Sequence, residues 1–160
     1  MPATLQEPSE SNAFLTPQVR LLRESLRRLA GTELCDPSMN DAKAARAVFF
    51  APFVVVSHDT AADPVFNYAN QAALELFGMT WEEFTSLPSR RSAEAPDRAE
   101  RARLLAEVTS KGFIGNYGGV RIAKSGRRFR IENATVWNLA DEDGTPRGQA
   151  AMFADWEALG

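Results

Sequence analysis

The sequence contains few of the residues on which metal and cofactor chemistry usually depends. It has one cysteine, Cys35, and one histidine, His58, in 160 residues. A lone cysteine excludes an internal disulfide framework and is typical of a reducing compartment. Transition-metal sites usually draw on several imidazole or thiolate ligands. We therefore expect no metal site in this chain.

Long apolar runs and an excess of positive charge are also missing. No apolar run approaches the ~20 residues that span a membrane, and residues 1–12 lack the apolar core of a signal peptide. The formal net charge is −3, whereas nucleic-acid recognition usually leaves a basic stripe on a protein. We therefore expect a cytoplasmic protein that contacts neither a membrane nor nucleic acid.

The composition is otherwise that of an ordinary globular protein, with 44% hydrophobic and 24% charged residues. Residues 1–13 are rich in Pro, Ser, Glu and Asn and are predicted to form a disordered tail. Residues 14–43 are predicted to form a helical extension, because apolar residues recur there at helical spacing. Residues 44–156 are predicted to form one folded domain.

The residue patterns of this domain are typical of an α+β fold. Two strands are predicted at 49–57 and 65–69. Asn70 can cap the helix that follows, and Thr80-Trp81-Glu82-Glu83 is a capping box for another. A longer helix at 96–111 precedes the remaining strands. This order predicts an antiparallel sheet with helices on one face, preceded by the N-terminal amphipathic helix.

Two segments indicate which side chains face the interior. In the helix at 96–111 the leucines and Val108 are predicted to face inward, whereas Asp97 and Arg101 form an i,i+4 pair on the solvent side. The strand at 127–139 alternates between apolar and polar residues. Its inward face is predicted to carry Phe129, Ile131, Asn133, Thr135, Trp137 and Leu139.

Several segments resemble known sequence patterns. Residues 63–80 are similar to the start of PAS domains, where a strand is followed by an Asn, an amphipathic helix and a Gly. Ala95-Pro96-Asp97-Arg98 and Asp141-Glu142-Asp143-Gly144 resemble a PAS helix start and a PAS hairpin. More specifically, residues 51–58, 87–94 and 126–132 resemble a stand-alone bacterial MEKHLA-domain protein. The resemblance covers about residues 44–156 and implies a PAS-like fold with a role in sensing or regulation.

The departures from related light and haem sensors limit the cofactor chemistry. Flavin-binding light sensors of this fold carry a Gly-x-Asn-Cys motif, whose cysteine forms the photoadduct. Here 87–94 stands at that place, and Cys35 lies far upstream. Photoadduct chemistry is therefore excluded, while non-covalent flavin binding stays open. Haem-binding relatives commonly use a histidine of the long helix, and 96–111 has none. We expect no bound cofactor.

Two groups of residues are candidate ligand contacts. A cavity between sheet and helices would be mostly apolar with a few polar groups. The same apolar residues would also serve as a packed core. In the connection at 87–94, Arg90 and Arg91 offer the paired donors that suit a carboxylate or phosphate, unless they pair with nearby glutamates in a solvated loop. The predicted cavity residues are Tyr68, Phe77, Phe84, Ile131, Asn133, Thr135 and Trp137.

His58 with Asp59 or Asp63 is the group most like catalytic machinery. Such a pair can act as acid and base within a suitable pocket, although Asp before Pro64 is also favoured in a turn for its own backbone hydrogen bonds.

We expect that the chain is not an enzyme. The leading hypothesis is a non-enzymatic sensory module that binds a small molecule or a regulatory protein and forms a homodimer. The alternatives are a small α+β enzyme using these residues and a dimerisation scaffold without a ligand.

Overall fold

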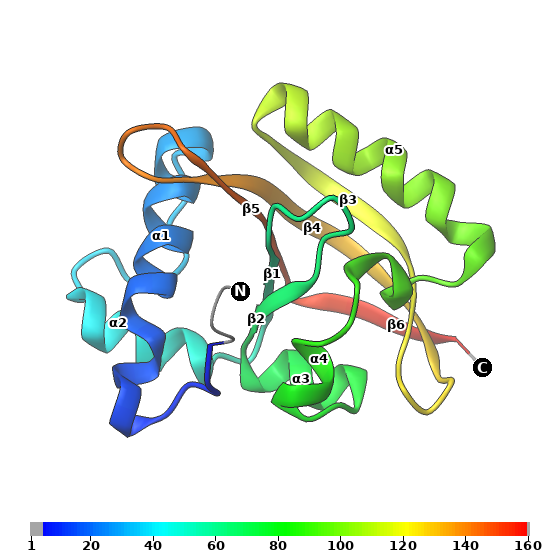
Figure 1. Cartoon of the computed structure of the whole chain (residues 1–160), viewed down its shortest axis with the longest axis horizontal. Coiled ribbons are helices and arrows are strands. Elements are labelled where there is room, and N and C mark those ends of the chain that lie inside the picture. The colour runs from blue at the N-terminus through cyan, green and yellow to red at the C-terminus, as the bar shows by residue number, and fades with distance from the viewer. Residues whose placement is uncertain (1–4, 160) are drawn as a thin grey trace.

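The computed structural model describes residues 5–159, which form a six-stranded antiparallel sheet with helices on both faces (Figure 1). The strands run in the order β2-β1-β5-β4-β3, and β6 pairs with β4 beyond the end of β5. In chain order the elements are η1 (Glu10–Leu15), α1 (Thr16–Ala30), α2 (Asp41–Phe49), β1 (Val54–His58), β2 (Phe66–Ala69), α3 (Gln71–Phe77), α4 (Trp81–Phe84), η2 (Ser89–Ser92), α5 (Ala95–Lys111), β3 (Phe113–Ile122), β4 (Arg128–Ala140), β5 (Pro146–Phe153) and β6 (Asp155–Leu159).

The segment before α1 contacts α2 and α4 where the structure describes it. The 3-10 helix η1 packs Phe14 against Phe49 of α2, with ring centroids 5.9 Å apart. The Trp81 indole N–H donates to the Leu5 carbonyl at 2.8 Å. The predicted disorder of residues 1–13 stays a prediction, and within it the Leu5 carbonyl contacts α4 through this hydrogen bond. Residues 1–4 lie outside the described residues.

Side-chain caps fix the two short helices that follow β2. The fully buried Asn70 accepts the Ala73 backbone N–H with its Oδ1 at 3.2 Å and donates its amide to the Val48 and Phe53 carbonyls at 3.0 and 2.8 Å. Asn70 therefore joins α2, β1 and α3 at one point, in addition to capping α3. The capping-box prediction at Thr80 is also confirmed, because its hydroxyl and the Glu83 carboxylate exchange hydrogen bonds with each other's backbone amides.

Strand β4 changes the direction of its side chains at Asn133. Upstream, the Phe129 ring packs on Phe77 of α3 at a centroid distance of 5.3 Å. Downstream, Trp137 donates its indole N–H to the Leu22 carbonyl of α1 at 3.2 Å. Asn133 has a left-handed φ of 54°, and the pairing of β3 with β4 shifts register in this region. The single alternation predicted for this strand is therefore wrong, since such an irregularity turns the strand about its axis.

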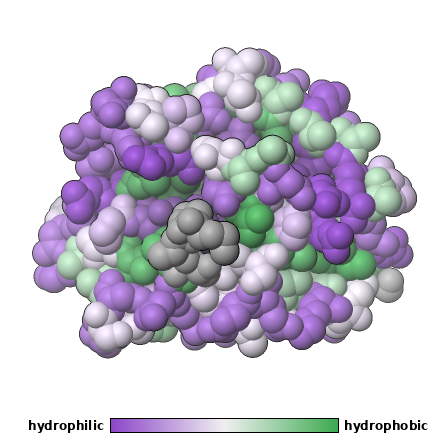
Figure 2. Space-filling view, viewed as in Figure 1, coloured by the Kyte–Doolittle hydropathy of each residue, from purple (hydrophilic) through white to green (hydrophobic). Residues whose placement is uncertain are grey.

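Helix α1 covers the sheet face opposite to α5. The α1 residues Val19, Leu22 and Leu26 are fully buried, and Ser25 donates its hydroxyl to the Ala140 carbonyl at 3.3 Å. Figure 2 shows mostly hydrophilic residues on the visible surface, with hydrophobic residues in smaller areas between them, an ordinary mixture for a protein exterior. Within residues 5–159, the helices fall short of the length and apolar character that crossing a membrane requires.

A candidate ligand-binding cavity

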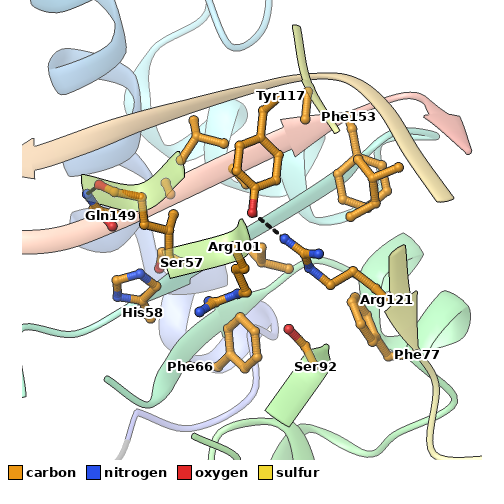
Figure 3. Close-up of a pocket in the computed structure, with 17 residues that line it drawn as sticks. Ser57, His58, Phe66, Phe77, Ser92, Arg101, Tyr117, Arg121, Gln149 and Phe153 are labelled. Atoms are coloured by element: carbon orange, nitrogen blue, oxygen red, sulfur yellow. Dashed lines mark hydrogen bonds between the residues drawn. The ribbon is translucent and has the colours of Figure 1, made fainter. Parts of the chain in front are cut away.

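A cavity of about 60 Å³ lies between the sheet and the η2–α5 segment (Figure 3). Its apolar wall comes from the strands, from α3 and from α5, and its polar residues come from five different elements. The apolar residues that line it include Phe66, Phe77, Leu105, Ile131, Val136 and Phe153. The polar ones include His58, Ser92, Arg101, Tyr117, Arg121 and Gln149.

Arg121 of β3 is a buried arginine, with only 6% of its surface exposed. Its guanidinium donates to the Val120 carbonyl at 2.9 Å and to the Tyr117 hydroxyl, and lies 5.5 Å from the centroid of the Tyr117 ring. A Cβ atom at Gly119 would come within 2.9 Å of this guanidinium. Glycine at that position therefore leaves the space that Arg121 occupies.

Arg101 of α5 brings a second positive charge to the same cavity. In Figure 3 its guanidinium lies between His58 and Arg121. Burial, and secondarily the charge of Arg121, lower the pKa of Arg101 to about 10. At neutral pH Arg101 is therefore still protonated. The prediction that Arg101 lies on the solvent side of its helix is wrong, because Arg101 precedes Leu105 by one helical turn and shares its inward face.

His58, at the end of β1, contributes an unpaired nitrogen to the cavity. Its Nδ1 lies 2.9 Å from the Asp59 carbonyl oxygen. That oxygen only accepts, so Nδ1 carries the proton. Its Nε2 is buried and lacks a hydrogen-bond partner among residues 5–159. Burial, opposed by the Asp59 backbone carbonyl, lowers the pKa of His58. In the neutral ring, Nε2 is thus an acceptor without a donor.

The acidic residues near these groups are engaged elsewhere. Asp59 accepts the backbone amides of Ala61 and Val65 at 3.1 and 3.0 Å. Asp63 forms a two-point pair with Arg90, with oxygen–nitrogen distances of 2.9 and 3.2 Å. Among the ion pairs of the described residues, none includes a cavity arginine. The cavity thus holds positive charge without an opposite charge from the protein.

Only part of the predicted site is brought together by the structure. Phe77 and Ile131 line the cavity. Phe84 is fully buried and stacks on the lining residue Phe66 at 4.2 Å. Tyr68 is also fully buried but is not a lining residue, and it meets the Trp81 ring edge-on. These two aromatic residues therefore belong to the packed core, which was the alternative to lining a ligand cavity.

The other predicted contacts lie away from the cavity. Asn133 is exposed, and Thr135 and Trp137 follow the turn of β4 toward the α1 face. Arg90 is held by Asp63 at the surface, and Arg91 is exposed. The placement of Arg90 differs from the predicted pairing with glutamates, because the aspartate before Pro64 lies closer to it in the fold.

The cavity residues that sequence reasoning missed are Arg101, Tyr117, Arg121 and Gln149. Two signals were present in the sequence. Arg101 stands at helical spacing from inward-facing residues of α5, and Arg121 sits two residues after a pair of glycines within a strand. Neither signal shows that both arginines reach one cavity, because that depends on how α5 crosses the sheet.

Comparisons with known proteins identify relatives of the chain. A family model described as MEKHLA domain matches residues 16–158. The homeobox-leucine zipper protein HOX32 of Oryza sativa subsp. indica is 30% identical over 95 residues, which are 59% of this chain and 11% of that protein. The protein HOX29 of the same organism is 26% identical over 144 residues, which are 88% of this chain and 17% of that protein. The chain therefore spans a small part of these relatives.

Solved structures show the same fold. An RNA-binding light-oxygen-voltage receptor matches with a TM-score of 0.62 and 20% identity over 76% of this chain and 34% of that chain. The light-state dimer of the fungal photoreceptor Vivid matches with a TM-score of 0.59 and 15% identity over 97% of this chain and 100% of that chain. A PAS domain from Colwellia psychrerythraea matches with a TM-score of 0.57 and 16% identity over 73% of this chain and 94% of that chain. The predicted PAS-like α+β fold is confirmed.

The cavity does not fit a flavin. Its volume is about 60 Å³, whereas pockets for drug-sized ligands and cofactors have about 300–1,000 Å³. The Arg121 and Tyr117 side chains point toward each other at this cavity (Figure 3). Cys35 lies in the connection between α1 and α2, away from the residues that line the cavity. The lining residues therefore form a site smaller than the one a flavin requires.

Proposed function

Because the chain belongs to the MEKHLA domain family, we propose that it is a non-enzymatic sensory and regulatory module whose interior cavity binds a small molecule. The observation that carries this proposal is the position of β4 between the cavity and α1. Val136 lines the cavity, and the next residue, Trp137, donates its indole N–H to the Leu22 carbonyl on the other face. A shift of β4 on ligand binding would therefore move the contacts of α1 directly.

The contacts between α1 and the end of β4 supply the readout. Ser25 of α1 donates its hydroxyl to the Ala140 carbonyl and accepts the Ala140 backbone N–H, at 3.3 and 3.2 Å. Arg28 donates to the same carbonyl at 2.7 Å. These bonds join α1 to the end of β4. The ligand signal in this proposal is a change in how firmly α1 holds the sheet, which a regulatory protein or a second copy of the chain would detect.

The geometry favours this function over acid–base catalysis. An acid–base pair requires a carboxylate within hydrogen-bond reach of the imidazole. The Asp59 carboxylate instead caps the turn through the Ala61 and Val65 amides, and Asp63 pairs with Arg90. The residues proposed for catalysis thus have structural partners. Of the ligand contacts predicted from the sequence, the proposal keeps Phe77 and Ile131.

The cellular compartment and nucleic-acid binding are also part of the proposal. We propose that it acts in the cytoplasm and binds no nucleic acid itself, which its net charge of −3 supports. The basic residues at the start of β4 are partly paired, since Arg128 lies 3.7 Å from the Glu94 carboxylate. The homeobox-leucine zipper relatives extend far beyond the matched region, which is 11% and 17% of their length.

The experiment combines a native mass spectrum of freshly purified protein with thermal-shift screening of metabolites. A compound that binds in the cavity raises the Tm of the wild type and slows amide exchange in α1 and β4. The variant Ala134→Leu tests the location, because Ala134 lines the cavity and the larger side chain fills it. Ala106→Leu is the control, since Ala106 is exposed on α5.

Four results would count against the proposal. Binding that survives Ala134→Leu would place the ligand outside the cavity. Binding without any change of exchange in α1 would remove the proposed readout. Consumption of the compound by the wild type, lost in His58→Ala, would favour the enzyme. A dimer that forms with no compound bound, and that Ala134→Leu leaves intact, would favour a scaffold without a ligand.

A further inference from the structure

The cavity concentrates positive charge where the protein provides no negative charge. Arg101 and Arg121 both line it, and the buried His58 Nε2 faces no donor among the described residues. We propose that the ligand of this cavity is a small carboxylate, whose charged group lies between Arg101 and Arg121 and whose alkyl part contacts the apolar wall. This inference rests on the proposed function, because it names the chemical class of the ligand.

The two arginines bring their charges to the same cavity without a counter-charge, Arg121 as a buried and Arg101 as a half-buried side chain. Burying a charged group without an opposite charge is strongly unfavourable, and two like charges in one cavity repel each other. The Tyr117 hydroxyl and ring partly compensate Arg121. Among residues 5–159, Arg101 has neither a hydrogen-bond partner nor an ion-pair partner for its side chain. A bound carboxylate would neutralise this charge through the paired hydrogen bonds that guanidinium groups form best.

The size of the cavity limits the length of the carboxylate. An apolar cavity of 150 Å³ binds benzene, which has six non-hydrogen atoms, so the volume of about 60 Å³ corresponds to a ligand of roughly two or three non-hydrogen atoms. Formate has this size, and acetate, with one atom more, is at the upper limit. A longer chain would have to displace Phe66, Phe77 or Ile131 from the apolar wall.

The apolar wall favours a carboxylate over an inorganic oxyanion. Phosphate and sulfate carry polar oxygens on every side, and several of these would face the Phe66, Val136 and Phe153 side chains without hydrogen bonds. Leaving such groups unpaired in an apolar environment costs free energy. Acetate instead presents its oxygens at one end and a methyl group at the other, which matches the two sides of the cavity.

The experiment is an isothermal titration of the full chain with sodium acetate at constant ionic strength. Acetamide is the matched neutral ligand, since it has nearly the same shape and no charge. A ligand of four non-hydrogen atoms binds no tighter than about tens of micromolar, so titrations cover the millimolar range. We expect acetate to bind at least tenfold more tightly than acetamide and than butyrate.

Variants assign the binding to the two arginines. Arg101→Gln and Arg121→Gln should each weaken acetate binding at least tenfold, the usual loss for a charge-assisted hydrogen bond. Arg103→Gln is the control on the same helix, because Arg103 is exposed and pairs with Glu100. It should leave acetate affinity within twofold of the wild type.

A stability measurement separates a binding role from a packing role. Arg101→Met removes the uncompensated charge and keeps most of the side-chain volume. We expect the Tm of the ligand-free protein to rise by roughly 2–4 °C and acetate binding to be lost. A lower Tm with unchanged acetate affinity would show that Arg101 only packs, and would overturn the inference.

The remaining outcomes distinguish this inference from the proposed function. Nitrate or phosphate binding that exceeds acetate binding would overturn the carboxylate. A neutral compound found by thermal-shift screening, blocked by Ala134→Leu but indifferent to both arginine variants, would overturn the anion and support the cavity as a binding site. Absence of binding by acetate, the other anions and every screened compound would contradict both.

Discussion

The two faces of the sheet differ in how their buried charges are compensated. On the side of α1, Leu22 and Trp137 are fully buried, and the buried Arg23 of α1 donates to the Asp41 carboxylate at 3.0 Å. The Arg23 Nε and the Tyr68 hydroxyl lack a hydrogen-bond partner among the described residues. On the other face, the arginines lack a counter-charge and His58 Nε2 lacks a donor. Close packing stabilises a fold, whereas charges without a counter-charge around a cavity are typical of sites kept for function. The comparison assigns stability to the first face and binding to the second.

The largest expected effect tests the face under α1. Trp137→Ala should lower the free energy of unfolding by ~3–5 kcal/mol, because it empties a fully buried position. Urea denaturation measures this change. Trp156→Ala is the control, since 38% of that indole is exposed on β6. Thr80→Ala provides a second reference value, because removal of an N-cap lowers the free energy of unfolding by ~1 kcal/mol. A Trp137 effect below that of Thr80 would contradict the tight packing of this face.

The next effect concerns the closeness of β1 and β5 at the rim of the cavity. A Cβ atom at Gly148 would come within 1.9 Å of the His58 carbonyl oxygen, and Gly148 has a φ of 126° that other residues rarely adopt. Gly148→Ala should therefore lower the free energy of unfolding by about 2–3 kcal/mol, the size of strong local strain. Thermal or urea denaturation measures it, and Gly144→Ala provides a control with positive φ but open space. Equal losses in the two variants would show that the strands are not in close contact here.

Much of this arrangement could be predicted from the sequence where the signals are local. Asn70 and the Thr80–Glu83 box act through residues three positions away, so their role follows from spacing alone. The left-handed Asn133 could not be predicted in the same way, since asparagine tolerates many conformations. One such residue reversed the inward face of β4, and with it the predicted positions of Thr135 and Trp137.

The candidate site was harder to predict than the fold because its key residues act over long range. Strand β3 begins at Phe113, although its glycines argue against a strand and only its last residues alternate clearly. That strand carries Tyr117 and Arg121. Arg101 has an acidic residue four positions before it, which favoured the solvent side. In the fold, packing of α5 over the sheet outweighs this weak pair and brings both arginines together.

The smallest expected effect is a pH dependence that belongs to the cavity face. The lowered pKa of His58 means that the unfolded chain takes up its proton at a higher pH than the folded protein does. Stability from this residue is therefore fully present above the ordinary value of 6.5 and is lost as pH falls through the lowered value, with a slope of at most ~1.4 kcal/mol per pH unit. The Arg101 charge also lowers the pKa of His58, whereas Asp59 and the Gln149 amide oppose this lowering.

Denaturation of the wild type and His58→Gln at several pH values should show this loss of stability only in the wild type. Saturating acetate should reduce it, because a carboxylate beside Arg101 offsets the positive charge that helps to lower the pKa of His58. A loss that is identical with and without acetate would separate His58 from the ligand, and an identical loss in His58→Gln would assign the pH dependence to other groups.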